Sequence, residues 1–165
     1  MLPAAELQAI EVQPRWAVWH PKTRVGNALA LPYPDGHFDG ICTSPTYGNR
    51  MADHFQAATP TGRNTYTHHH GTPLAAENSG LLQWGRAYCA FHCRAWQEAR
   101  RVLRPGGVFV LNIKDHFRRG RRQRVTLWHL LCLVNLGFRV VEHRQVGHAV
   151  VGIRGQRRSV YRLRE

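Results

Sequence analysis

The chain has 165 residues, 43% of them hydrophobic, which is enough for a single domain with a substantial core. No apolar run approaches the ~20 residues of a membrane-spanning helix, and no segment has the pattern of a signal peptide, so we expect a cytoplasmic protein without a membrane partner. Lys and Arg number 23 against 10 Asp and Glu, for a formal net charge of +13. This excess favours a polyanionic partner, nucleic acid first, although a generally basic surface would give the same count.

The cysteines and histidines do not form a recognisable metal-binding pattern. There are four cysteines, Cys42, Cys89, Cys93 and Cys132. They lie in apolar segments without a paired Cys-x-x-Cys arrangement, so we expect reduced core residues. Three adjacent histidines, residues 68–70, cannot all point at one ion in regular structure, and no metal site is predicted.

Two short segments near the N-terminus carry polar residues where regular structure ends. Residues 9–14, Ala-Ile-Glu-Val-Gln-Pro, indicate a brief strand stopped by a proline, with Glu11 near its end. In a nucleotide-binding fold, an acid at this position binds the ribose diol, while a solvated Glu at a strand end fits the pattern equally well. Residues 15–20 can begin a short helix. Residues 33–36, Tyr-Pro-Asp-Gly, predict a turn before the next strand.

The most informative stretch is Thr43-Ser44-Pro45-Thr46-Tyr47-Gly48-Asn49-Arg50, which follows an apolar run over 38–42. That run is short enough for a buried strand. A hydroxyl, a rigid turn and an aromatic ring would then stand at the carboxyl edge of a sheet, where open α/β folds bind ligands. Simple packing of Tyr47 at a corner is the alternative. Residues 48–80 lack periodicity, and we expect this irregular insertion to face the substrate.

The second half of the chain alternates clear helices and strands. Apolar residues recur at three- and four-residue steps over 81–102, and Pro105-Gly106-Gly107 stops that helix. The further predicted elements are a buried strand over 108–113, a helix over 126–135 capped by Thr126, and an antiparallel pair of strands over 138–146 and 159–163.

A basic segment, residues 114–124, follows the buried strand. It begins with Lys114 and contains five arginines, Arg118, Arg119, Arg121, Arg122 and Arg124. If the strand before it is parallel to the one before Ser44, this loop leaves the same sheet edge, beside the turn. Contacts with backbone phosphates follow naturally, and a solvated basic loop is the alternative.

Two motifs resemble known enzymes. Residues 43–47 resemble the Thr-Ser-Pro-Pro-Tyr variant of the catalytic motif of amino-group DNA methyltransferases that use S-adenosylmethionine, with Thr46 in place of the second proline. Residues 101–107, Arg-Val-Leu-Arg-Pro-Gly-Gly, are similar to the helix-to-strand junction of Rossmann-like methyltransferases. The resemblance implies an α/β fold with a Rossmann-like methyltransferase sheet over 1–165, mostly parallel, with an antiparallel C-terminal strand.

The resemblance also implies roles for individual residues. Ser44 and Pro45 would present acceptors that localise the lone pair of an exocyclic amine, and Tyr47 would stack on a base turned out of the duplex. The S-adenosylmethionine residues would be Glu11, Asn27, Ala28 and Thr43, with Asn27 standing where the family has an acidic residue. The DNA-binding residues would be Asn49, Arg50, Lys114 and the five arginines of 118–124.

The substrate and completeness of the site stay open at this point. N4 of cytosine is preferred over N6 of adenine, and a C5-cytosine enzyme is disfavoured because Cys42 lies within the strand. An RNA base methyltransferase of the guanine-N2 type and an inactive nucleic-acid-binding remnant are alternatives. The family's glycine-rich cofactor turn, with its first strand and helix, has no counterpart here. We therefore expect a gap in the sheet, weak or no S-adenosylmethionine binding by the chain alone, and self-association. A truncated gene product and a split enzyme completed by a second chain or homo-oligomer are the favoured accounts, and a local rearrangement that closes the sheet is the alternative.

Overall fold

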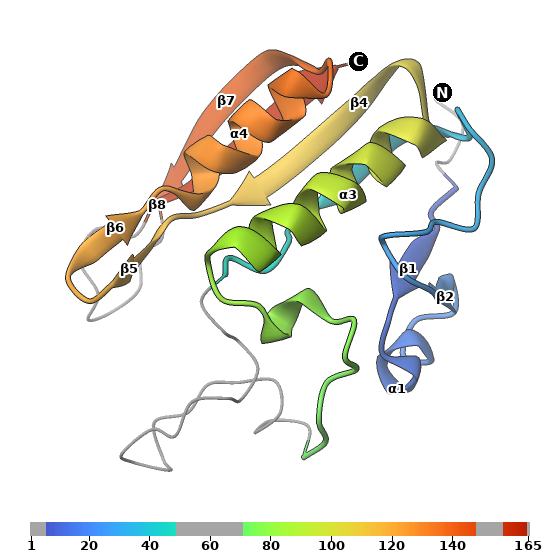
Figure 1. The fold of residues 1–165 in the computed structure, drawn as a ribbon. Helices are drawn as coiled ribbons and strands as arrows, with labels where there is room; N and C mark the ends of the chain where they lie inside the picture. Colours follow the sequence, from blue (N-terminus) through green and yellow to red (C-terminus); the bar gives the residue numbers. More distant parts are fainter. Residues whose placement is uncertain (1–5, 49–70, 148–156, 165) are drawn as a thin grey trace.

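The computed structural model describes residues 6–48, 71–147 and 157–164, and its main layer is a four-stranded sheet in the order β3-β4-β8-β7 (Figure 1). β3 is parallel to β4, and β8 is antiparallel to both of its neighbours, so the predicted antiparallel C-terminal strand is confirmed. The remaining three strands share one direction. The bounds are Phe38–Thr43 for β3, Leu103–Ile113 for β4, Arg139–Gly147 for β7 and Arg157–Arg164 for β8.

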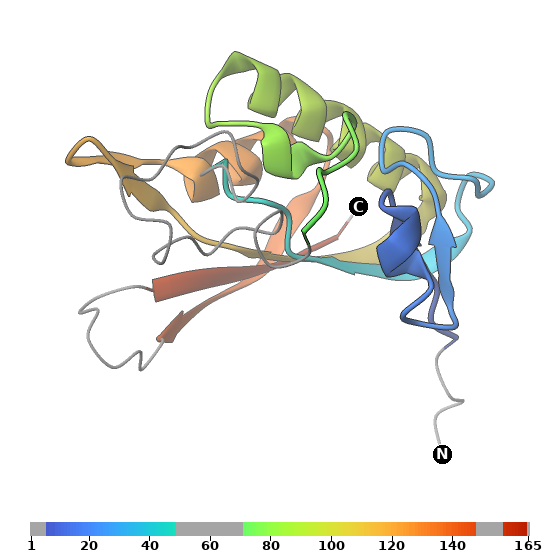
Figure 2. The same ribbon diagram turned by 90° about the horizontal axis from the view of Figure 1, so that it is seen from below.

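Two helices, α3 (Arg86–Val102) and α4 (Val125–Asn135), cover one face of this sheet (Figure 2). The burial pattern of β4 explains the arrangement, because Phe109, Leu111 and Ile113 are fully buried while the residues between them are half-buried. Alternation along the strand thus places every second side chain beneath the helices. The core lies between the sheet and these two helices. In the described ranges, no helix is both long and apolar enough to cross a membrane.

The helix ends differ from the sequence expectation in two places. α3 begins at Arg86, and Leu81 belongs instead to a short 3-10 turn, η2 (Ser79–Leu81). The predicted cap by Thr126 is wrong, because α4 begins one residue earlier and Arg124 is its N-cap without a side-chain hydrogen bond. The carboxylate of Asp115 performs the capping role, accepting from the N–H of Thr126 at 2.8 Å. An acceptor eleven residues away is not visible in a local sequence pattern.

The N-terminal elements form a separate unit beside the sheet. β1 (Ala9–Glu11) and β2 (Thr23–Val25) pair in parallel around the short helix α1 (Pro14–Ala17), and they form a two-stranded sheet of their own. Among the described strands, β3 pairs only with β4 and β1 only with β2. A groove of ≈ 390 Å³ lies between them, lined by residues of β1, β3 and α3. Within the described residues, this groove lies where the gap in the sheet is expected.

Strand β3 is less buried than its apolar sequence predicts. Gly40 and Cys42 are exposed, and the remaining apolar positions are only half-buried. The expectation that Cys42 is a core residue is wrong, because β3 is an edge strand of the described sheet and its side chains reach the groove.

The basic segment is a hairpin, not the loop that its composition predicts. β5 (His116–Arg118) and β6 (Arg121–Gln123) are antiparallel and joined by the two-residue turn Arg119-Gly120. Both turn residues have positive φ, 50° and 71°, as a type I′ turn requires. Arginine is an unusual residue in that conformation, so the turn gives little sequence signal.

Candidate functional site

The residues after β3 form an irregular segment over 44–48 that bends at Gly48, and we call it the Ser44–Gly48 turn. The hydroxyls of Ser44 and Tyr47 are 3.0 Å apart and share a hydrogen bond. Gly48 has φ 67°, and a Cβ there would lie 2.9 Å from the backbone nitrogen of Trp84, so only glycine fits. The Trp84 N–H donates to the Gly48 carbonyl at 2.7 Å, which fixes where the chain leaves the turn.

Thr46, the departure from the resembling motif, connects the turn to η2. Its hydroxyl donates to the carbonyl of Ser79 at 3.2 Å and lies 3.0 Å from the Ser79 hydroxyl. A second proline at this position would lack these bonds. The turn is therefore held from the side of residues 79–81 as well as by β3.

A buried chain of hydrogen bonds supports the turn from beneath. Trp96 Nε1 donates to His129 Nδ1 at 3.0 Å. Because indole is only a donor, a neutral His129 must carry its proton on Nε2, 2.8 Å from the Tyr88 hydroxyl. That nitrogen donates to Tyr88, and the Tyr88 hydroxyl donates in turn to the carbonyl of Thr46. The side chains of α3 and α4 thus fix the orientation of one peptide group in the turn.

The ionisation of this cluster is set by burial. Burial lowers the pKa of His129 to about 2 and that of His92 to about 4, and it raises the pKa of Tyr88. His92 Nδ1 donates to the Tyr88 carbonyl at 3.0 Å, one turn away on α3. All three groups are therefore neutral near pH 7, and the hydrogen-bond directions derived above hold there.

A cavity of ≈ 310 Å³ opens above the turn, where β1, β2 and β3 all end. It brings together all four residues predicted to hold a cofactor and two of the predicted catalytic residues. Its lining includes Glu11, Asn27, Ala28, Thr43, Ser44, Pro45 and Thr46. Glu11 Oε1 accepts from the N–H of Gln13 at 2.8 Å, which holds the carboxylate at the cavity rim.

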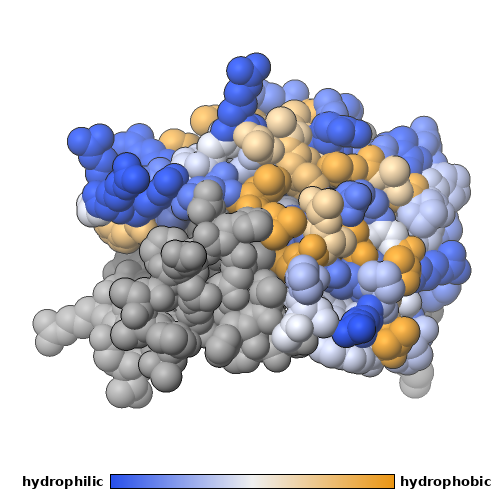
Figure 3. All heavy atoms as spheres, turned by 60° about the horizontal axis from the view of Figure 1, so that its bottom comes forward, coloured by the Kyte–Doolittle hydropathy of each residue, from blue (hydrophilic) through white to orange (hydrophobic). Residues whose placement is uncertain are grey.

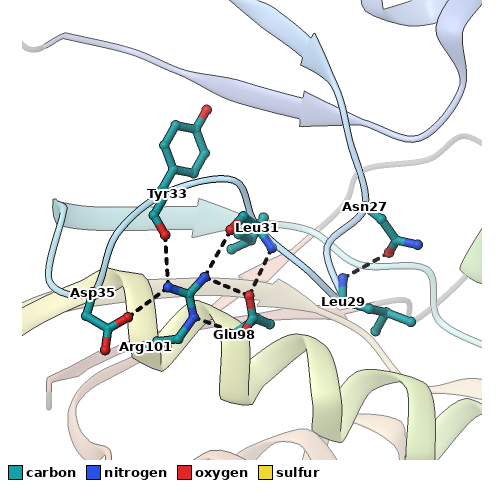
Figure 4. Close-up of polar contacts among 7 residues, drawn as sticks. All are labelled: Asn27, Leu29, Leu31, Tyr33, Asp35, Glu98 and Arg101. Carbon is teal, nitrogen blue, oxygen red and sulfur yellow. Dashed lines mark hydrogen bonds and ion pairs between the residues drawn. The ribbon is translucent and has the colours of Figure 1, made fainter.

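The loop that presents Asn27 and Ala28 is fastened to α3 by Arg101 (Figure 4). The guanidinium of Arg101 donates to the carbonyls of Leu31 and Tyr33 and to the carboxylates of two side chains. Those carboxylates belong to Asp35 and Glu98. Within the loop, Asn27 Oδ1 accepts from the N–H of Leu29 at 2.9 Å, so its amide NH₂ is the group that remains for a ligand.

The predicted nucleic-acid residues lie at the same edge as the turn. Lys114 Nζ stands 5.5 Å from the centroid of the Tyr47 ring, a cation–π distance. The hairpin β5–β6 continues directly from there, with Arg118, Arg119, Arg121 and Arg122 exposed on it and Arg124 exposed before α4. Arg122 is paired with Asp115 at 2.7 Å. Asn49 and Arg50 lie outside the described residues, as do residues 51–70 of the predicted insertion.

No group of three or more His, Cys, Asp or Glu side chains within the described ranges could hold a metal ion. The histidines of residues 68–70 fall outside those ranges.

Sequence reasoning missed Tyr88, Trp96 and His129, which it treated as packing residues or did not consider. Their role depends on α3 and α4 lying side by side under the turn, which no local pattern encodes. A usable signal was present: polar aromatic side chains at two apolar-face positions of a helix need buried partners.

No protein-family model and no curated protein sequence matches this chain. Solved structures do share its fold. The chain superposes on TTHA0409 of Thermus thermophilus, a candidate DNA modification methylase, with a TM-score of 0.53 at 19% identity. The chain has a methyltransferase fold. The match covers 85% of this chain and 50% of TTHA0409, which has also been solved in complex with S-adenosyl-L-methionine.

Two further structures extend the comparison. The cytosine-N4-specific PvuII DNA methyltransferase has a TM-score of 0.55 at 13% identity, covering 84% of this chain and 47% of its own. An S-adenosylmethionine-dependent methyltransferase of Methanosarcina mazei has a TM-score of 0.55 at 12% identity, covering 94% and 80%. The chain thus spans about half the length of TTHA0409 and of the PvuII enzyme, and most of the length of the third protein.

Proposed function

We propose that the protein transfers a methyl group from S-adenosylmethionine to an exocyclic base amine in DNA, with N4 of cytosine as the preferred target. The observation that carries this proposal is the ≈ 310 Å³ cavity, in which Glu11 and Asn27 face the same space as Ser44 and Pro45. A cofactor site and an amine-binding turn are then adjacent, as direct transfer requires. The shared fold with methyltransferases and the net charge of +13 add support.

The cavity lining suits the nucleoside half of the cofactor. The Glu11 carboxylate offers acceptors for a ribose diol, and the Asn27 NH₂ offers a donor for adenine nitrogens. Ala28 is small and leaves room for a base, while Thr43 lines the wall toward the turn. Bound S-adenosylmethionine supplies an electrophilic methyl group on its sulfonium.

The turn would activate the amine through hydrogen-bond acceptors. A base amine is a poor nucleophile because its lone pair is delocalised into the ring, and acceptors on its hydrogens localise that pair. Ser44 Oγ and the carbonyls of Ser44 and Pro45 are suitably placed in sequence, whereas the Thr46 carbonyl already accepts from Tyr88. Tyr47, held beside Lys114, would stack on the extruded base.

The glycine-rich turn that the resembling family uses for the methionine half of the cofactor has no counterpart in the described lining of the cavity. We propose that a strand and turn from a second chain or a second copy fill the ≈ 390 Å³ groove and complete this half. Both edges of the groove belong to described strands that have no partner on that side within the described sheets, which is a favourable site for strand addition. Tight S-adenosylmethionine binding by a monodisperse monomer in calorimetry would contradict this part of the proposal.

The enzymatic proposal is tested by transfer of a radiolabelled methyl group to duplex DNA, tRNA and rRNA. Ser44→Ala and Tyr47→Ala should each lower transfer by ~10²–10³, because the first removes an acceptor for the amine and the second removes the ring that holds the extruded base in position. Thr126→Ala, a hydroxyl deletion on α4 away from the cavity, serves as the matched control. Transfer only to RNA would contradict DNA as the substrate and favour an RNA base methyltransferase. Full activity of Tyr47→Ala with unchanged circular dichroism would rule out the assigned site.

A further inference from the structure

The hairpin β5–β6 carries one apolar side chain, Phe117, among its arginines. Phe117 is 74% exposed, the most exposed aromatic side chain that the structure describes. It pairs across the hairpin with Arg122, whose guanidinium is held by Asp115. Among the described residues, the hydrophobic core does not extend to this ring, so packing does not account for a phenylalanine at this position.

The stem of the hairpin begins at the Ser44–Gly48 turn. Lys114, two residues before β5, lies over the Tyr47 ring, and the next strand residues follow directly. The pKa of His116 is lowered, chiefly by burial, while Asp115 and the Tyr47 backbone act in the opposite direction. The exposed ring therefore stands three residues from a side chain in contact with Tyr47.

The hairpin projects from the edge at which β3 and β4 both end (Figure 1, Figure 2). In Figure 3, the end of the molecule that carries it is densely hydrophilic. A two-stranded ribbon fits the major groove of B-form DNA, and three arginines with no described carboxylate partner, Arg118, Arg119 and Arg121, can reach phosphates on either side. If the hairpin enters the groove, the Phe117 ring lies close to the bases.

We propose that Phe117 is a base-contacting wedge, which stacks on duplex bases beside the nucleotide that Tyr47 receives. This inference rests on the proposed function and extends it from phosphate contacts to a base contact. Extruding a nucleotide unstacks its neighbours, at a cost of a few kcal/mol. An aromatic ring inserted at the vacated step restores part of that stacking.

Equilibrium binding to a short mixed-sequence duplex, measured at several salt concentrations, tests the wedge. Phe117→Ala should lower affinity roughly 5- to 150-fold, the equivalent of ~1–3 kcal/mol for one stacked base, without changing the slope of log affinity against log salt. Arg119→Ala should instead reduce that slope by about 1. Phe117→Trp should restore affinity, and its added indole emission should be quenched on binding, whereas Phe117→Leu should not restore it.

The control is Leu131→Ala, which removes another exposed apolar side chain from α4 and should leave both affinity and slope unchanged. Equal affinity of Phe117→Ala and the wild type would overturn the wedge while leaving the proposed function standing. Absence of salt-dependent DNA binding by the wild type would overturn both. A loss seen with single-stranded RNA but not with the duplex would contradict a duplex wedge and favour the RNA alternative.

Discussion

The helix-covered sheet and the β1–β2 unit are two regions of very different construction. The sheet has an eleven-residue central strand with fully buried side chains under two helices, whereas β1 and β2 have three residues each and none is fully buried. Around the small unit, Val18, Trp19 and Val25 are exposed. The Ser44–Gly48 turn belongs to the first region, and Glu11 belongs to the second.

This difference separates the two halves of the proposed reaction. The groups that would bind the base amine stand on a rigid, hydrogen-bonded platform. Glu11 and Asn27, which would bind the cofactor, lie in the β1–β2 unit and the loop after it, where few contacts are buried. The hydrogen bonds from Arg101 to the carbonyls of Leu31 and Tyr33 fasten that loop to α3. Regions with few buried apolar contacts open at low free-energy cost. The turn is therefore preformed, and the cofactor side gains most from a ligand or an added strand.

The largest expected contrast comes from deleting one apolar side chain in each region. Phe109 is fully buried, with its ring centroid 5.4 Å from Trp96 and 5.5 Å from Phe138. Phe109→Ala should lower the free energy of unfolding by ~3–5 kcal/mol. Ile10→Ala, in half-buried β1, should cost about 1 kcal/mol or less. Urea unfolding of both variants measures the contrast, and equal losses would show that the two regions form one cooperative core.

Acid should weaken the helix–sheet region selectively. His92 and His129 have folded-state pKa values lowered by burial to about 4 and about 2, so the unfolded chain binds more protons below its ordinary histidine pKa of 6.5. The contribution of these two histidines to the free energy of unfolding is complete above pH 6.5. It falls as the pH drops toward about 4, by up to roughly 1.4 kcal/mol per pH unit for each histidine. Unfolding free energies measured across this range provide the check. His92→Gln should flatten the slope.

A smaller effect is expected from cutting the link between the helices and the turn. Tyr88→Phe leaves the His129 Nε2–H and the Thr46 carbonyl without their shared partner, which should cost ~1–2 kcal/mol and shift amide resonances over residues 44–48. Tyr33→Phe is the matched control, because the Tyr33 hydroxyl is buried without a partner among the described residues. Identical spectra for Tyr88→Phe and the wild type over the turn would remove the positioning role.

Sequence reasoning succeeded where the pattern is local. The end of the helix at 102, the strand before Ser44 and the antiparallel C-terminal pair follow from periodicity and turn residues. The start of the next strand does not, because β4 begins at Leu103 and includes Pro105-Gly106-Gly107, which were expected to precede it. It failed where partners come from elsewhere in the chain: Asp115 caps α4, and Tyr88 holds Thr46. These links depend on tertiary proximity, which propensity cannot supply.

The hairpin and the edge strand fall between these cases. The arginine-rich composition of residues 114–124 correctly predicted basic charge beside the turn. It gave no signal for the positive φ angles of Arg119 and Gly120, which make β5–β6 a hairpin. The apolar run over 38–42 correctly predicted a strand, but the expectation that this strand is buried was wrong. Burial of β3 would require a second neighbouring strand, and within the described sheet β3 pairs only with β4.

The exposed residue Cys42 offers a site for chemical labelling at the open edge of β3. The other thiols are half-buried, and burial raises the pKa of Cys89 and, together with Cys93, brings that of Cys132 to about 12. Because Cys42 is the exposed cysteine, an alkylating reagent reaches it first. A fluorophore attached there stands two residues from Ser44 and within the groove, so its emission reports when that space becomes filled.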